Sequence, residues 1–384
     1  KNSALENGAC ISLFRVDNCK IISSKTRLNY AVLAGGAIWV KEVKVMLQLK
    51  DLEMIRNKAK EGAGFFLANI NQLFHQNCTY IGNIATSETQ FRGGILTIEY
   101  SIRISINNSH FYQNTAFGPG GGIHIAHTDF MTIAESVFEN NRAKHNGGAV
   151  FATMVKVIDL ALTIFDHQIS QQNGGAVYLI GTQSQSKISI SNVSFTTNVA
   201  AVSAALYVES VIEIAIDHSY FIKNRVLSKA SALSVYVSSN MLTRIHISFC
   251  NFVNNVANDQ AAVIVISGAT ETDLNNTEIQ GTGTANVIVL HSATISIQNV
   301  RIQAVVLDSF LLDSQMSLLR FMTNLNFLCP YFAYVNEEYI IDEHKCGESE
   351  KDCYTTMLRY QCLRCTEITY SILMEKAVVN KLQE

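Results

Sequence analysis

The feature that most constrains the fold is a repeat of about 27 residues. In its clearest copy, which starts at Gly120, three small residues open an alternating stretch, a second such stretch follows, and Phe-x-x-Asn precedes the next triplet at Gly147. A repeat of this length predicts a solenoid rather than separate globular domains. The third residue of the triplet recurs at Cys10, Ala37, Gly64, Ile95, Gly122, Ala149, Ala176, Ala205, Ala232, Ala262, Asn286 and Leu311.

Each repeat alternates apolar and polar residues with the period of a β-strand. The position after the triplet and the one two residues later are apolar in nearly every repeat, as at Ile123 and Ile125. Side chains two apart share one face of a strand, so we expect both positions to point inward. The repeat at Ile95 fits two registers, with either Thr97 or Leu96 between its inward positions.

The Phe-x-x-Asn motif closes the second strand of most repeats. We expect the Phe to stack inside the core and the Asn to lie at a turn, where its amide can bond the Asn of the next coil. The pairs are Phe74/Asn77, Phe111/Asn114, Phe138/Asn141, Phe195/Asn198, Phe221/Asn224, Phe252/Asn255 and Phe321/Asn324.

These patterns predict an all-β fold. The repeat is too short for a β-α-β unit of about 30 residues or more, and no helical pattern lies between the strands. The sequence therefore predicts a right-handed parallel β-helix of about 12 coils over residues 1–326, with a small Cys-rich module over residues 327–384. Two corners look longer than the others, at Lys25–Ala34 and at Cys78–Arg92.

Five of the nine cysteines lie in the C-terminal segment: Cys329, Cys346, Cys353, Cys362 and Cys365. This density favours a disulfide-stapled module. A zinc site is the alternative, but only one Cys-x-x-Cys is present, and a redox motif would need a β-α-β setting. We expect no bound metal or other cofactor. The scattered Cys10, Cys19, Cys78 and Cys250 are interpreted as buried free thiols.

Composition excludes several classes of protein. A hydrophobic fraction of 48% with 16% charged residues argues against disorder. Basic and acidic residues are interleaved, the net charge is −3, and nucleic acid is not an expected partner. No apolar run reaches the length of about 20 residues that spans a bilayer, so any membrane anchor is expected to lie outside this chain. The chain starts at Lys1, which indicates a processed form or a piece of a longer protein.

An aromatic row is the main candidate for a binding surface. It occupies the position between the two inward residues of the first strand, at Trp39, Phe66, His124, Phe151, Tyr178 and Tyr207. Stacked coils would align these residues into an outward stripe about 30 Å long, which suits a partner protein, a neighbouring rod or a glycan. Two alternatives are that the rings only stabilise the sheet and that another part of the chain covers them.

Four Asn-x-Ser/Thr sequons, at Asn77, Asn107, Asn192 and Asn275, would accept glycans in a secreted protein.

No cluster of acids and bases recurs in coil register, as an enzyme that cleaves polysaccharide would need. We expect His124 to be solvated or stacked rather than a metal ligand. The sequence therefore names no catalytic residue.

The alternation of Gly-Gly-Ala with Phe-x-x-Asn over roughly residues 8–326 resembles the repeats of chlamydial polymorphic outer-membrane proteins. It is also similar to the large pectin-lyase-like β-helix surface proteins of ciliates and other protists. In those, Cys-rich segments of the kind seen at Cys362, Cys365 and Tyr370 follow the helix. The resemblance implies an extracellular or cell-surface rod that acts as a structural or adhesive piece of a larger protein. The expected partners are other protein chains, copies of itself included, and the alternative is a β-helix that binds or cleaves glycans.

Overall fold

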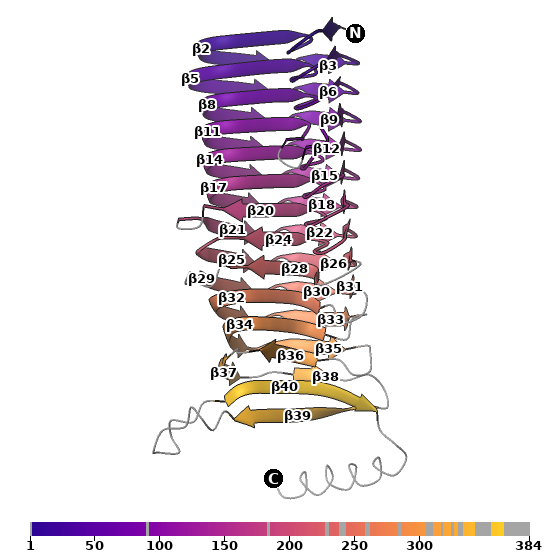
Figure 1. The fold of residues 1–384 in the computed structure, drawn as a ribbon, viewed down its shortest axis with the longest axis vertical. Helices are drawn as coiled ribbons and strands as arrows, with labels where there is room; N and C mark the ends of the chain where they lie inside the picture. Colours follow the sequence, from indigo (N-terminus) through magenta and orange to yellow (C-terminus); the bar gives the residue numbers. More distant parts are fainter. Residues whose placement is uncertain are drawn as a thin grey trace, which may run out of the picture.

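The chain folds into a rod of stacked β-coils (Figure 1). The computed structural model describes residues 2–89, 92–182, 185–226, 230–237, 243–257, 262–282, 286–304, 310–315, 318–323, 326–328, 333–341 and 355–364. Within these residues all regular structure is β, and neighbouring coils pair in parallel. Each coil contributes to three sheets that run along the rod. The all-β parallel solenoid is therefore confirmed, and its right-handed winding stays a prediction.

The first sheet, the narrow sheet, contains strands of only two residues. Its members are β1 (Ser3–Ala4), β4 (Tyr30–Ala31), β7 (Lys58–Ala59), β10 (Ile84–Ala85), β13 (Thr115–Ala116), β16 (Arg142–Ala143), β19 (Ile169–Ser170), β23 (Val199–Ala200), β27 (Arg225–Val226) and β31 (Val256–Ala257). The first residue of each strand faces outward. From β4 to β27 the second residue, usually Ala, is buried. Among the described residues, these ten strands mark about ten coils in which all three sheets are present.

The second sheet, the Phe sheet, carries the aromatic core residues. Its twelve strands are β3 (Lys25–Arg27), β6 (Glu53–Ile55), β9 (Thr79–Ile81), β12 (His110–Tyr112), β15 (Val137–Glu139), β18 (Ile164–Asp166), β22 (Ser194–Thr196), β26 (Tyr220–Ile222), β30 (Asn251–Val253), β33 (Glu278–Thr282), β35 (Arg301–Ala304) and β38 (Asn326–Leu328). In the strands from β6 to β30, the central side chain points into the core.

The third sheet, the long sheet, follows the small-residue triplets. In the first six coils one strand forms both halves of the sheet: β2 (Ile11–Ile22), β5 (Ile38–Lys50), β8 (Phe65–Gln76), β11 (Leu96–Asn107), β14 (Ile123–Ala134) and β17 (Val150–Ala161). The later coils use β20 (Val177–Gly181) with β21 (Lys187–Ser191), β24 (Leu206–Glu209) with β25 (Glu213–Asp217), β28 (Ala230–Tyr236) with β29 (Thr243–Ser248), β32 (Ala262–Asn275), β34 (Asn286–Gln298), and β36 (Phe310–Gln315) with β37 (Leu318–Thr323).

The long strands bend at one residue with positive φ. The six bend residues have φ between 53° and 63°, and the fifth residue of each strand supplies them: Arg15, Glu42, Asn69, Tyr100, His127 and Met154. A left-handed residue turns the strand without breaking its pairing with the next coil, so the two halves of one strand face different directions. The side chains at the bends consequently project from the rod.

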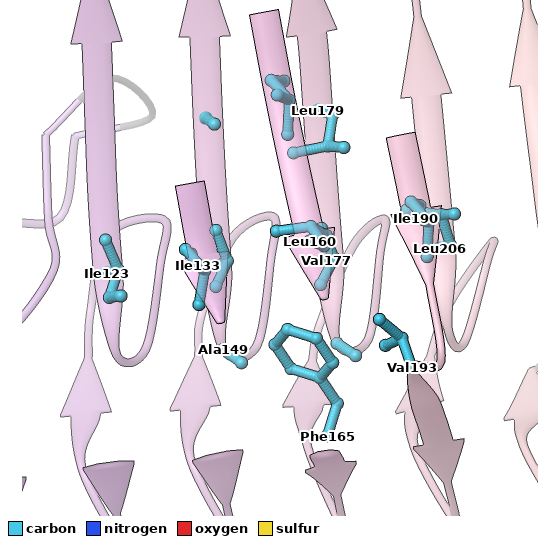
Figure 2. Close-up of a cluster of buried hydrophobic side chains, with 14 of the residues drawn as sticks. Ile123, Ile133, Ala149, Leu160, Phe165, Val177, Leu179, Ile190, Val193 and Leu206 are labelled. Atoms are coloured by element: carbon cyan, nitrogen blue, oxygen red, sulfur yellow. The ribbon is translucent and has the colours of Figure 1, made fainter. Parts of the chain in front are cut away.

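The inward positions predicted from the alternation are confirmed. Ile123, Val177 and Leu206 are completely buried and belong, with Phe165 from the Phe sheet, to one cluster of buried hydrophobic side chains (Figure 2). At the ambiguous repeat, Leu96 and Ile98 face inward, because Leu96 pairs with Phe65 and Ile123.

The coil of β32 corrects one detail of the predicted register. In this coil Ile264 pairs with Leu233 and Ile266 pairs with Val235. Both lie one residue later in the chain than the repeat count predicts. The pairing of β28 with β32 is irregular between Ala230 and Leu233, which accounts for the shift by one residue.

The aromatic core column is continuous, and it corrects the motif at two points. The rings stack face to face with centroids 4.5–5.2 Å apart, through Tyr80, Phe111, Phe138, Phe165, Phe195, Phe221 and Phe252. Phe74, predicted to belong here, is 42% exposed, and Tyr80 takes its place. Phe321 also lies elsewhere, because it pairs with Ser296 in the long sheet, and Asn324 is outside the described residues.

A polar ladder accompanies this column. In successive coils a side-chain amide oxygen accepts a hydrogen bond from the backbone N–H of the equivalent residue in the preceding coil. The accepting residues are Asn29, Asn57, Asn83, Asn114, Asn141, Gln168, Asn198, Asn224 and Asn255. The predicted Asn ladder is confirmed from Asn114 onward. Asn77 is not a member, because it lies at the exposed turn after β8 and donates to Asp51 Oδ1 at 2.6 Å.

The predicted long corners are also corrected. Lys25–Ala34 is an ordinary coil segment that contains β3, the ladder residue Asn29 and β4. In Cys78–Arg92, β9 and β10 are equally regular, so the extra length lies only in residues 86–92. Two described residues of this corner contact other coils: Lys144 Nζ, on a later coil, is 3.2 Å from Glu88 Oε1, and Arg92 Nη1 is 3.4 Å from Glu61 Oε1 on the preceding coil.

The parallel stack ends in an antiparallel hairpin. Strands β39 (Ala333–Ile341) and β40 (Thr355–Arg364) pair with each other, and β40 also meets β36 at Phe310 (Figure 1). Cys362 lies in β40 opposite Val335. Cys329, Cys346, Cys353 and Cys365 lie outside the described residues, so the predicted Cys-rich module stays a prediction, as does the boundary at residue 326.

Candidate functional site

The aromatic row lies in register on the first half of the long sheet. Backbone pairing places one residue of each coil beside the next, in the order Ser12, Trp39, Phe66, Thr97, His124, Phe151, Tyr178, Tyr207 and Ser234. These side chains point away from the core. Both sequence neighbours of each aromatic residue in the row are buried and face inward, and successive side chains of a strand lie on opposite faces.

From His124 onward the rings stack on one another. Centroids are 5.3 Å apart for His124 and Phe151, 5.4 Å for Phe151 and Tyr178, and 4.6 Å for Tyr178 and Tyr207, with interplanar angles of 4–7°. Tyr236 continues the row at 5.3 Å from Tyr207. Stacking occupies the faces of the inner rings, so these rings present mainly their edges to the exterior.

The expectation of a fully exposed stripe does not hold for the middle of the row. His124 is completely buried, and Phe151 and Tyr178 are only 4% and 6% exposed, whereas Trp39, Phe66 and Tyr207 are half-buried. The cause is the turn before each strand, which runs beside the row. A Cβ at Gly94 would lie 2.7 Å from His124 Cβ, and one at Gly174 would lie 3.0 Å from Tyr178 Cβ.

Above the row lies an elongated groove formed by two adjoining hollows. The larger has a volume of about 480 Å³ and has Ala126, Phe151 and Tyr178 in its lining. The smaller, of about 340 Å³, includes Trp39 and Phe66. Glu99 and Tyr100 line both hollows, so the two form one groove across neighbouring coils.

The two walls of the groove have different origins. One wall is the bend of the long strands, where Tyr100, His127 and Met154 project; we call these three residues the ridge. Tyr100 is 57% exposed and stacks on His127 at 4.7 Å, and Met154 is 49% exposed. The opposite wall contains Arg92, which the long corner 86–92 supplies, and Asn146 from the turn before β17.

Charged groups lie at the middle of the groove and, on β5, at its N-terminal end. Glu99 is shared by both hollows, Arg92 borders one and Lys41 the other. Arg92 also pairs with Glu61, whose pKa is raised by burial, although the Arg92 cation opposes that rise. At the far end, Tyr178 Oη donates to Glu209 Oε2 at 3.3 Å. Burial, with the nearby Glu209 carboxylate, raises the pKa of Tyr178.

The residues that the sequence analysis named lie in different parts of the rod. His124 is stacked and buried, so the prediction of a stacked histidine is confirmed and its solvated alternative is wrong. Among the described residues, no group of three or more His, Cys, Asp and Glu side chains is arranged to hold a metal ion. Of the scattered thiols, Cys78 and Cys250 are buried as predicted, whereas Cys10 is exposed and Cys19 half-buried, because they belong to the terminal coil.

All four sequons lie along one corner of the rod. Asn77 and Asn192 are the left-handed residues at the end of the long sheet, and Asn107 and Asn275 are the last residues of β11 and β32. This corner lies between the second half of the long sheet and the Phe sheet, and it does not border the groove. Glycans at these positions, which stay a prediction, would leave the groove open.

Sequence reasoning missed Tyr236, which continues the aromatic row, and Tyr100, which belongs to the ridge. Tyr236 was missed because the repeat count places Ser234 beside Tyr207, although Tyr236 lies two residues later on the same face. Tyr100 was missed because its projection depends on the left-handed bend, which its residue type does not signal. The position of Asn69, four residues after Phe65, was the available clue to a bend there.

Comparison with known proteins identified no relative: no family model, no curated protein and no solved structure matches the chain. A search of the described residues also found no helix with the length and apolar character needed to cross a membrane. What the molecule shows is therefore a class of architecture, the parallel β-solenoid, with an aromatic groove on its long sheet.

Proposed function

We propose that this chain is a non-enzymatic structural or adhesive rod, exposed outside the cell, that acts through protein–protein contacts in the aromatic groove. The observation that supports the proposal is that the groove and the ridge lie side by side on one face of the rod. Sequons confined to a different corner and the Cys-rich C-terminal sequence support the extracellular location.

The partner that this geometry favours is a second copy of the rod. The ridge of Tyr100, His127 and Met154 projects from the rod and is partly apolar. It runs beside the groove, across the same coils. Two copies related by a twofold axis would each place a ridge in the groove of the other, as an isologous interface requires. Burial of the exposed Tyr100 and Met154 side chains would supply apolar area to the contact.

Glycan binding fits the central part of the groove less well. Sugar rings are recognised mainly by stacking on an open aromatic face, and the faces of Phe151 and Tyr178 are covered by neighbouring rings. Edges of stacked rings form an apolar floor that suits the side chains of a protein partner.

The test is sedimentation velocity of the wild-type chain at several concentrations, compared with Tyr100→Asn/Met154→Asn. Asn69 occupies the equivalent bend in β8, so Asn tolerates this backbone. We expect the wild type to associate as concentration rises and the variant to remain monomeric. Tyr178→Ser is unsuitable, because Tyr178 is stacked and buried and its loss would disturb the sheet.

A matched control is Phe74→Thr/Phe130→Thr, which removes two exposed rings from the second half of the long sheet. This control should associate like the wild type. A wild type that remains monomeric at every concentration, or a ridge variant that associates normally, would contradict the proposed contact.

A second candidate, binding or cleavage of a glycan, is favoured by the carboxylates beside the groove. Glu99 lines both hollows, and Glu61, with its raised pKa, lies behind Arg92. Glycosidases use a pair of carboxyl groups, one of which has a raised pKa. Incubation with neutral and acidic polysaccharides, followed by measurement of reducing ends, tests this candidate. Cleavage that Glu99→Gln abolishes would replace the structural proposal.

A further inference from the structure

The narrow sheet carries a row of cations, and none of these cations has a carboxylate partner among the described residues. Its ten outward positions align in register along the rod: Ser3, Tyr30, Lys58, Ile84, Thr115, Arg142, Ile169, Val199, Arg225 and Val256. None of these ten positions holds an acidic residue, and a cation occurs at every third strand from Lys58 onward. At about 4.8 Å per strand, the three cations are about 14 Å apart.

Further cations flank the three in the same coils. Arg56 and Lys60 lie beside Lys58, Lys144 beside Arg142, and Lys223 beside Arg225. All are exposed, and among the described residues only Lys144 has a carboxylate partner. On the other faces, by contrast, cations commonly pair with an acid in the neighbouring coil, as Lys25 does with Glu53, Lys187 with Glu213 and Arg244 with Glu271.

The carboxylates that border this surface are mostly engaged. Four of them lie 2.8–3.7 Å from a cation or a histidine: Glu61 with Arg92, Glu88 with Lys144, Glu139 with His110, and Asp166 with His167. Among the described carboxylates beside this surface, Glu6, beyond β1, has no such partner. A chain with a net charge of −3 thus concentrates unpaired positive charge on one face.

Apolar side chains fill the positions between the cations. Tyr30, Ile84, Val199 and Val256 are 37–43% exposed, and Ile169 is half-buried. A linear polyanion is recognised by cations and hydrogen-bond donors and gains little from such side chains. The interface of an anionic bilayer, however, offers phosphate groups to the cations and an apolar region to the aliphatic side chains.

From this pattern we infer that the outward face of the narrow sheet is a docking surface for an anionic lipid membrane. The rod would lie along the bilayer with Lys58, Arg142 and Arg225 at the head groups. The groove on the long sheet, at the other side of the glycine turns, would remain free for its protein partner. The inference does not depend on the groove, and the two are tested by different residues.

The experiment is co-sedimentation of the whole chain with vesicles of phosphatidylcholine, with and without phosphatidylserine, at low and at physiological salt. We expect binding only to the vesicles with phosphatidylserine, and weaker binding at higher salt. Lys58→Gln/Arg142→Gln/Arg225→Gln should lower the partition coefficient about a hundredfold. The control Lys20→Gln/Lys50→Gln/Lys156→Gln, with the same change in charge on other faces, should bind nearly as well as the wild type.

A second variant separates a membrane from a linear polyanion. Ile84→Ser/Val199→Ser/Val256→Ser retains every cation, and it should weaken vesicle binding while leaving any binding to dextran sulfate unchanged. The inference is overturned if the wild type does not bind phosphatidylserine vesicles, or if both cation variants lose binding equally. It is also overturned if the aliphatic variant binds vesicles as the wild type does, since charge alone would then explain the attraction. Circular dichroism should show the same β spectrum for all variants, because every substituted residue is exposed or half-buried.

Discussion

At the scale of single residues, the buried amide ladder is the most demanding feature of this fold. Asn141 Oδ1 accepts both the backbone N–H and the side-chain amide of Asn114, at 3.1 and 3.0 Å, and its own amide donates to Phe111 O at 2.8 Å. All three groups are buried, so water cannot replace a lost partner.

We therefore predict that Asn141→Ala lowers the free energy of unfolding by about 3 kcal/mol, because it leaves buried donors and an acceptor without partners. Gln72→Ala, which removes an exposed amide from β8, should change it by less than about 0.5 kcal/mol. Urea unfolding followed by circular dichroism measures both. Equal effects for the two variants would mean that the ladder contributes nothing specific.

His75 is a second residue with an unusual environment. It takes an inward position beside Leu49 and Ile106, with Nε2 at 2.7 Å from Tyr80 Oη and Nδ1 at 3.2 Å from Ser109 Oγ. Burial lowers the pKa of His75 from 6.5 to about 3. Below pH 6.5 the unfolded chain binds a proton at this histidine that the folded chain does not bind, so folding becomes less favourable as the pH falls.

We predict that this single group removes up to about 5 kcal/mol of stability between pH 6.5 and pH 3. His75→Leu/Tyr80→Phe gives this coil the inward Leu and the stacked Phe that neighbouring coils already have. Its unfolding midpoint should fall less steeply with decreasing pH than that of the wild type. Parallel curves for the two proteins over this range would show that His75 is not the cause.

At the scale of the element, the glycine turns set the spacing between coils. A Cβ at Gly121 would lie 2.1 Å from Gly148 O and 2.7 Å from Arg142 O, and both atoms belong to the backbone. At Gly82, where φ is +59°, the nearest atom is the flexible Arg56 Cγ at 3.5 Å. The first glycine is therefore needed for space and the second only for its backbone angle.

Accordingly, Gly121→Ala should destabilise the rod by about 3 kcal/mol or more, or prevent folding, because the two backbones must move apart. Gly82→Asn should be tolerated within about 1 kcal/mol, since Gln113 and Asn140 occupy the same corner with φ of 52° and 55°. Thermal unfolding of both variants tests this. A tolerated Gly121→Ala would show that the coils are less tightly packed at this turn than the distances indicate.

The sequence repeat predicted correctly those positions at which packing in the core determines the residue type. Inward positions, the Phe column and most of the Asn ladder follow from period and motif, because every coil repeats the same environment. The motif failed at Phe74 and Asn77 because the true pair, Tyr80 and Asn83, has Tyr in place of Phe. The burial of His124 and Phe151 was not predictable, since it depends on how closely the preceding turns approach the row.

At the scale of the whole molecule, the solenoid separates three surfaces along one rod. The groove and its ridge lie on the long sheet, the sequons follow the corner beside the Phe sheet, and the unpaired cations follow the narrow sheet. Because the three surfaces are formed by different residues, a change in one surface leaves the other two intact. This separation is what allows the proposed contacts to be tested one at a time.

The measurement that tests the central proposal most directly is electron microscopy of the native protein at several concentrations. If rods associate through the groove and ridge, pairs or lateral arrays should appear as concentration rises, and Tyr100→Asn/Met154→Asn should abolish them. Single dispersed rods at every concentration would contradict the proposal that copies of this chain bind one another along the aromatic groove.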